Sequence, residues 1–81
     1  MNDKILQAVL SGKQDNNIKF KDIRTLMLKL YFNERIKGDL FIYKRKDIPE
    51  RINIQPVGNM AKSYQVRQIR NIILKYHLGD E

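Results

Sequence analysis

The sequence predicts a two-layer α+β domain in which helices pack on one face of a three-stranded antiparallel sheet. Three observations support this fold class. Apolar residues recur at helical spacing near both ends of the chain, the apolar period changes to two in the middle, and a Gly-Asp pair divides that middle region. With 81 residues, 42% of them hydrophobic and 31% charged, the composition is that of one small folded domain.

The first expected element is a short amphipathic helix over residues 3–10, which ends before Gly12. Residues 13–17 are polar and are typical of a linker. A helix this short is unstable in isolation, so we expect it to pack on the domain or on a partner. We therefore divide the chain into an N-terminal helix and linker, residues 1–15, and a main domain, residues 16–81. The apolar stripe of this helix consists of Ile5, Leu6, Val9 and Leu10.

A second, longer helix is expected from about Phe20 to Tyr31, because apolar residues recur there at steps of three and four. Asp22 in the first turn and Lys29 near the last turn both suit the helix dipole. The residues of the apolar stripe are Phe20, Ile23, Leu26, Met27 and Leu30.

Two β-strands are expected next, over residues 32–37 and 40–45, because side chains alternate with a period of two in both runs. Gly38 and Asp39 separate the runs and suit a tight turn, so the two strands should form a hairpin.

A third strand and a closing helix complete the predicted order of helix, helix, three strands and helix. Residues 46–50 are expected to form a turn, and the third strand should follow over residues 51–57. Pro56 limits the far end of that strand to an edge position. The last helix is expected over residues 63–75, with Gly79 just beyond it as a helix stop. Its core stripe consists of Val66, Ile69, Ile73 and Tyr76.

Charge is the unusual bulk property, because sixteen basic residues against nine acidic ones give a net charge of +7. A field of this sign attracts polyanions, of which nucleic acid is the commonest and an acidic protein the second, although the surface could also be merely soluble. The chain has no cysteine, which excludes disulfides, thiolate catalysis and cysteine-based zinc sites. No apolar stretch approaches ~18 residues and the opening residues do not resemble a secretory signal, so we expect a cytoplasmic protein with no membrane partner.

The residues by themselves contain no catalytic set. The single histidine, His77, lies near the end of the last helix, where a histidine usually complements the helix dipole or faces solvent. Asp39 beside Gly38 is interpreted as a turn residue rather than a general base. The acidic residues lack metal-ligand spacing and no glycine-rich loop precedes a helix, so we expect neither a metal nor a cofactor.

Basic residues gather where an RNA backbone could use them. Arg35 and Lys37 share one face of the first strand, and Lys44 lies near the end of the second. The last helix contains no acidic residue, and Arg67 and Arg70 flank one side of it. The alternative is a solvated basic face, in which lysines at strand ends only protect the sheet from edge pairing. Further candidates are Lys62 for a phosphate contact, Gly38 in the turn between the two strands as an RNA-binding residue, and Tyr43 and Tyr64 for stacking on bases.

Three segments together resemble the HicA family of ribonuclease toxins. Residues 20–38 are similar to the opening helix and first strand of the family, and residues 52–56 and 61–76 to the third strand and closing helix of one subgroup. The stretch Tyr-Gln-Val-Arg-Gln-Ile-Arg-Asn-Ile-Ile in the last segment is the specific part. The resemblance covers about residues 16–78, and the family fold, a compact relative of the double-stranded-RNA-binding domain, agrees with the order of elements predicted above.

The resemblance implies the toxin half of a type II toxin–antitoxin pair. HicA toxins cleave mRNA without a metal and are held inactive by a HicB antitoxin bound over the catalytic face, so a hetero-oligomeric complex is implied. The family signature is a glycine, then serine or aspartate, then a histidine at the start of the second strand. Gly38 and Asp39 fit this signature, but Leu40 stands in the place of the histidine.

Leu40 removes the proton acceptor on which the family's chemistry depends. A histidine can take the proton of a ribose 2′-hydroxyl, assistance worth ~10²–10⁴ in rate, and leucine cannot. We therefore expect an mRNA-cleaving toxin in an inactive form. The alternatives are a non-catalytic double-stranded-RNA-binding module and a domain that binds only an acidic antitoxin. Two explanations of the leucine compete, namely a substitution made to inactivate a toxic enzyme, which we favour, and a natural loss of activity.

Overall fold

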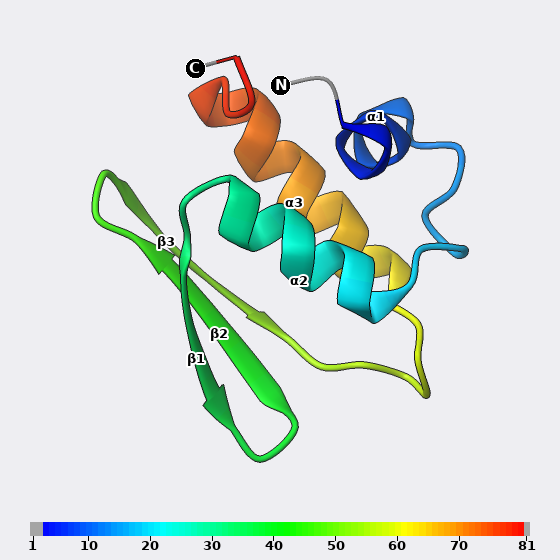
Figure 1. Ribbon diagram of the computed structural model, residues 1–81. Helices are drawn as coiled ribbons and strands as arrows, with labels where there is room; N and C mark the ends of the chain where they lie inside the picture. Colours follow the sequence, from blue (N-terminus) through cyan, green and yellow to red (C-terminus); the bar gives the residue numbers. More distant parts are fainter. Residues whose placement is uncertain (1–2, 81) are drawn as a thin grey trace.

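The computed structural model describes residues 3–80 and shows the predicted two-layer α+β fold (Figure 1). α2 and α3 cover one face of a three-stranded sheet, and α1 packs against both of these helices. The elements in chain order are α1 (Lys4–Ser11), α2 (Phe20–Lys29), β1 (Asn33–Lys37), β2 (Leu40–Arg45), β3 (Ile48–Ile54) and α3 (Ser63–Tyr76).

The strands form an antiparallel meander in the order β1-β2-β3. Arg35 pairs with Ile42, which in turn pairs with Asn53, so these three residues lie abreast across the sheet. Gly38 in the β1–β2 turn has φ +59, a left-handed conformation that glycine adopts without strain. A Cβ added there would meet nothing within 4 Å, so the conformation of the expected hairpin turn, rather than space, favours glycine.

The core lies between the sheet and the helices and includes the N-terminal helix. Leu6 and Val9 of α1 are buried in the same apolar cluster as the residues of α2, α3 and the sheet. Gly79 lies beyond α3, and a Cβ there would come within 2.9 Å of Leu6 Cδ2. The expectation that the N-terminal helix packs on the domain is therefore confirmed. The largest fully buried side chains are Tyr43, Ile23, Leu26, Met27, Leu30, Ile52, Ile54, Ile69, Val9 and Val66.

The third strand begins at Ile48, inside the turn that was expected over residues 46–50. A bulge between Tyr43 and Arg45 brings Ile48 opposite Arg45, where its side chain is buried. Pro49 is tolerated in the strand because β3 lies at an edge of the sheet, where a missing N–H can face solvent. Burial of Ile48 therefore outweighs the local turn signal of the sequence.

The helix ends also differ from those expected. α2 ends before Tyr31, whose backbone adopts the left-handed φ of +68. α3 extends to Tyr76, and His77, with φ +55, takes the left-handed cap position that was expected nearer Gly79. Ile72 joins the buried stripe of α3, whereas Tyr76 packs only at the edge of the core.

Candidate nucleic-acid interface on the sheet

The helices leave one face of the sheet uncovered, which we call the open face (Figure 1). Side chains alternate along each strand, and Tyr43, Ile52 and Ile54 are buried against the helices. The strand residues that alternate with these buried ones therefore point to the open face. These residues are Asn33, Arg35 and Lys37 of β1, Leu40, Ile42 and Lys44 of β2, and Arg51 and Asn53 of β3.

Among the strand residues that the structure describes, the open face carries four cations and no carboxylate. The cations, Arg35, Lys37, Lys44 and Arg51, are exposed, and none of them forms a salt bridge within residues 3–80. All four line a depression of about 250 Å³ that also includes Ile42 and Glu34, whose carboxylate is bound by Arg24. Two residues of strand span ~7 Å, so neighbouring cations can reach separate phosphates. A surface of this kind attracts a polyanion.

The two carboxylates of the strands face the helices, and both are neutralised there. Glu34 accepts hydrogen bonds from Arg24 of α2, at 3.1 Å to Nε and 3.0 Å to Nη2. Glu50 accepts from Lys75 Nζ of α3 at 2.8 Å and from the hydroxyl of Tyr76. These hydrogen bonds, first that from Lys75, lower the pKa of Glu50 to about 2. The strands therefore sort charge, with paired anions toward the helices and free cations outward.

Tyr43 belongs to the core rather than to the open face. Its side chain has no exposed surface, and its hydroxyl donates to Glu34 at 2.6 Å. Burial, reinforced by this hydrogen bond, raises the pKa of Tyr43 well above its usual value. The expectation that Tyr43 stacks on RNA bases is therefore wrong. Tyr64, at the start of α3, is 55% exposed.

Position 40 lies at the end of the open face that the β1–β2 turn closes. Leu40 pairs with Lys37 across the hairpin and shares its face with Ile42. The carboxylate of Asp39 accepts a hydrogen bond from Gln55 Nε2 at 3.3 Å, which suits a turn residue. Figure 1 shows this turn and the C-terminal end of α3 at opposite ends of the molecule, so His77 lies far from position 40.

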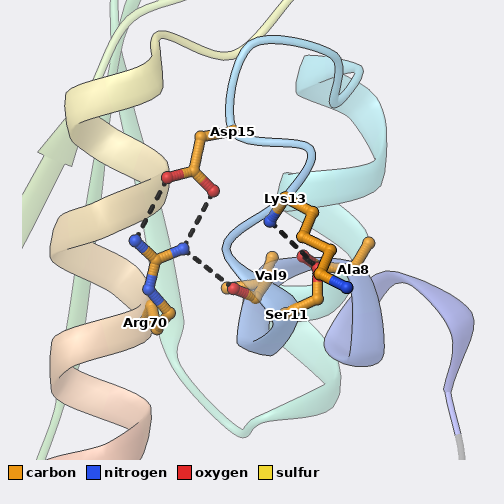
Figure 2. A network of polar contacts seen from close by, with 6 residues as sticks. All are labelled: Ala8, Val9, Ser11, Lys13, Asp15 and Arg70. Atoms are coloured by element: carbon orange, nitrogen blue, oxygen red, sulfur yellow. Dashed lines mark hydrogen bonds and ion pairs between the residues drawn. The ribbon is translucent and has the colours of Figure 1, made fainter.

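Arg70 was expected to bind RNA but instead holds the N-terminal segment on α3 (Figure 2). Its Nη1 donates to Asp15 Oδ1 at 2.8 Å and to the backbone oxygen of Val9 at 3.1 Å, and its Nη2 donates to Asp15 Oδ2 at 3.1 Å. Hydrogen bonds from Arg70 lower the pKa of Asp15. Oxygen atoms of the protein already accept the hydrogen bonds of this guanidinium. We therefore replace the predicted RNA-binding role of Arg70 by a structural role, the ion pair with Asp15.

The other two predicted RNA contacts of the closing helix also belong to the helical layer. Arg67 is exposed on α3, and Lys62 precedes α3 with its Nζ 5.9 Å from the ring centroid of Tyr64. Because α3 covers the side of the sheet opposite the open face, these cations do not share a surface with Arg35, Lys37 and Lys44. The predicted set of RNA contacts is therefore divided between two layers.

Arg51 is a residue of the open face that sequence reasoning missed. The sequence predicts its place in the third strand but does not by itself point to this residue as a phosphate contact. The signal was present, because Ile52 and Ile54 form the buried face of that strand and Arg51 alternates with them.

No family model, no curated protein and no solved structure matches the chain. Within residues 3–80, no group of three or more His, Asp or Glu side chains could hold a metal ion. In the same part of the chain, no helix has the length and apolar character needed to cross a membrane. The open face is therefore interpreted from its own chemistry.

Proposed function

We propose that this protein is an RNA-binding domain of the HicA toxin type whose open face holds the RNA backbone. The sorting of charge on the sheet carries this proposal, because Arg35, Lys37, Lys44 and Arg51 point outward without partners while the strand carboxylates are neutralised on the other side. Contacts between cations and phosphates supply most of the affinity of such a surface and do not depend on base sequence.

The side chain at position 40 decides whether the proposed RNA-binding face could also cleave RNA. The side chain at this position leaves β2 beside Lys37, so a histidine there would lie against a bound backbone. An imidazole accepts the proton of a ribose 2′-hydroxyl, and the 2′-oxygen bonds to the adjacent phosphorus as the bond from phosphorus to the 5′-oxygen of the next nucleotide breaks. The products are a 2′,3′-cyclic phosphate and a 5′-hydroxyl, whose oxygen takes its proton from water. Leu40 has no proton acceptor. We propose that the chain with Leu40 binds mRNA in the cytoplasm without cleaving it.

The same face suits an acidic protein partner. A HicB-type antitoxin that covers the open face would place its carboxylates against the cations that otherwise hold phosphates. RNA and antitoxin would then compete for one surface, and the antitoxin complex would be hetero-oligomeric.

A second candidate function is a non-catalytic double-stranded-RNA-binding module, and Leu40 itself favours it. This candidate keeps the open face as the RNA site but gives position 40 no chemical role, so a histidine introduced there would not create a ribonuclease.

Cleavage of RNA by Leu40→His in EDTA tests the catalytic part of the proposal. We expect Leu40→His to cut RNA at least ~100-fold faster than the unmodified chain, from the usual value of acid–base assistance. Ile42→His is the matched control, because it places a histidine two residues along the same strand and face and should remain silent. If Leu40→His binds RNA but does not cut it, the non-catalytic module is correct. If no form binds RNA, the open face serves only a protein partner.

A further inference from the structure

A second cavity lies on the helix-facing side of β2, at the same end of the sheet as position 40. Its volume is about 330 Å³, which falls within the range of small-molecule pockets. Phe41, which lines this cavity, directly follows Leu40, so adjacent residues of β2 face the cavity and the open face. The lining residues that carry the argument are Lys19, Lys21, Arg24, Phe41, Pro56 and Asn59.

In this cavity the guanidinium of Arg24 lies over the ring of Phe41, and we call this pair the platform. Cζ of Arg24 lies 4.7 Å from the ring centroid of Phe41, and the two hydrogen bonds to Glu34 fix the guanidinium plane. Phe20 holds the ring of Phe41 by an edge contact, with centroids 4.8 Å apart and planes at 71°. The side chain of Arg24 remains 39% exposed. Unpaired bases stack on aromatic rings and on guanidinium planes of this kind.

Free cations and an amide surround the platform. Lys19 and Lys21 are exposed at the N-terminal end of α2, and neither forms a salt bridge with another residue that the structure describes. None of the residues described as lining the cavity is acidic. The exposed amide of Asn59 can both donate to and accept from the edge of a base. A stacking plane, two cations and an amide together match a nucleotide better than an apolar side chain.

We propose that this cavity binds one unpaired nucleotide of an RNA strand, with the base on the Arg24–Phe41 platform and the phosphate near Lys19 and Lys21. The inference rests on the proposed function, because the open face reaches the β1–β2 turn beside Phe41, so a nucleotide of an RNA bound on that face could enter the cavity there. A base bound in this cavity would give the protein a preference among bases, which the phosphate contacts of the open face cannot provide.

The first test titrates the full chain with the 5′-monophosphates of adenosine, guanosine, cytidine and uridine, and with inorganic phosphate as the baseless probe. Two-dimensional NMR follows the backbone amide of Gly58, which lines the cavity, and Nε–H of Arg24. We expect both signals to shift with at least one nucleotide, and we expect inorganic phosphate to bind about tenfold more weakly, the usual value of one stacked base. Equal binding of phosphate and all nucleotides would overturn the proposal.

Two substitutions, each with a matched control, locate the site. Arg24→Lys keeps the charge but removes the stacking plane and should weaken nucleotide binding about tenfold, whereas Arg67→Lys on exposed α3 should not change it. Lys21→Gln removes one phosphate contact and should also weaken binding, whereas Lys13→Gln should not. Thermal melting checks that each variant is folded. If Arg24→Lys does not fold, Lys21→Gln still tests the site. Affinities unchanged within twofold in a folded Arg24→Lys or Lys21→Gln variant would overturn the proposal.

The two proposals fail in different ways. If Arg35→Gln weakens RNA binding while the cavity substitutions leave base preference unchanged, the nucleotide site is wrong and the RNA-binding function stands. If nucleotides bind in the cavity while Arg35→Gln has no effect on RNA, the open-face function is wrong and the nucleotide site stands.

Discussion

The affinity of this protein for RNA should fall steeply as the salt concentration rises. The slope of log affinity against log salt should be proportional to the number of open-face cations that contact phosphates. Each cation that neutralises a phosphate releases a counterion, so the slope of log affinity against log salt is about −0.9 for each contact on a double helix. Four cations predict a slope of about −3.6, which is a loss of about 150-fold between ~50 and ~200 mM salt. Replacing Arg35 and Arg51 by Gln leaves two contacts, so the slope should be about −1.8 and the loss about 12-fold.

Fluorescence anisotropy of a labelled RNA duplex at several salt concentrations measures these slopes. The matched control replaces Arg67 and Lys13 by Gln, which removes the same two charges from exposed positions outside the open face. The control should keep a slope near −3.6, since its four face cations are intact. Equal slopes for the two double variants would refute the reasoning, because binding would then follow net charge rather than the open face.

Two further predictions concern stability. Tyr31→Gly should raise the free energy of unfolding by about 0.5–1 kcal/mol in urea titrations, because Tyr31 is exposed and has φ +68, whereas Tyr31→Ala retains a Cβ and should give no such gain. Asp15→Asn should lower stability at pH 7 by roughly 1.5–3 kcal/mol, because the hydrogen bonds to Arg70 lose a charged acceptor. Since the pKa of Asp15 is lowered in the fold, its contribution is complete above the unfolded value of about 3.9 and is lost as the pH falls through the lower folded value. The Asn variant should therefore lose less stability than the unmodified chain on acidification below about pH 4, and an identical pH profile would contradict this assignment.

The spacing of apolar residues was sufficient to predict the helical layer and the sheet of this fold, but it did not predict where every helix and strand begins and ends. The stripes of α2 and α3 and the turn at Gly38 are local signals, because each depends on residues within one or two helical turns or on a single dipeptide. The start of β3 is not local. Residues 46–50 look like a turn, and only pairing with Arg45 across a bulge shows that Ile48 is a buried strand residue.

In the candidate site, too, some features can be predicted from local sequence signals and others depend on contacts between distant segments. Arg35 and Lys37 could be assigned to one face from alternation alone, and Arg51 could have been. The different roles of Arg67 and Arg70 could not, because both lie on one side of the same helix. Their roles separate only when the fold brings an acidic partner from a segment 55 residues away, which no spacing within α3 records.

The most direct test of the central claim is to map a bound RNA duplex on the protein by NMR at low salt. We expect the largest shifts on side-chain and backbone signals of Arg35, Lys37, Lys44 and Arg51, with signals of the exposed face of α3 around Arg67 unchanged. Shifts confined to α3, with the open face silent, would contradict it.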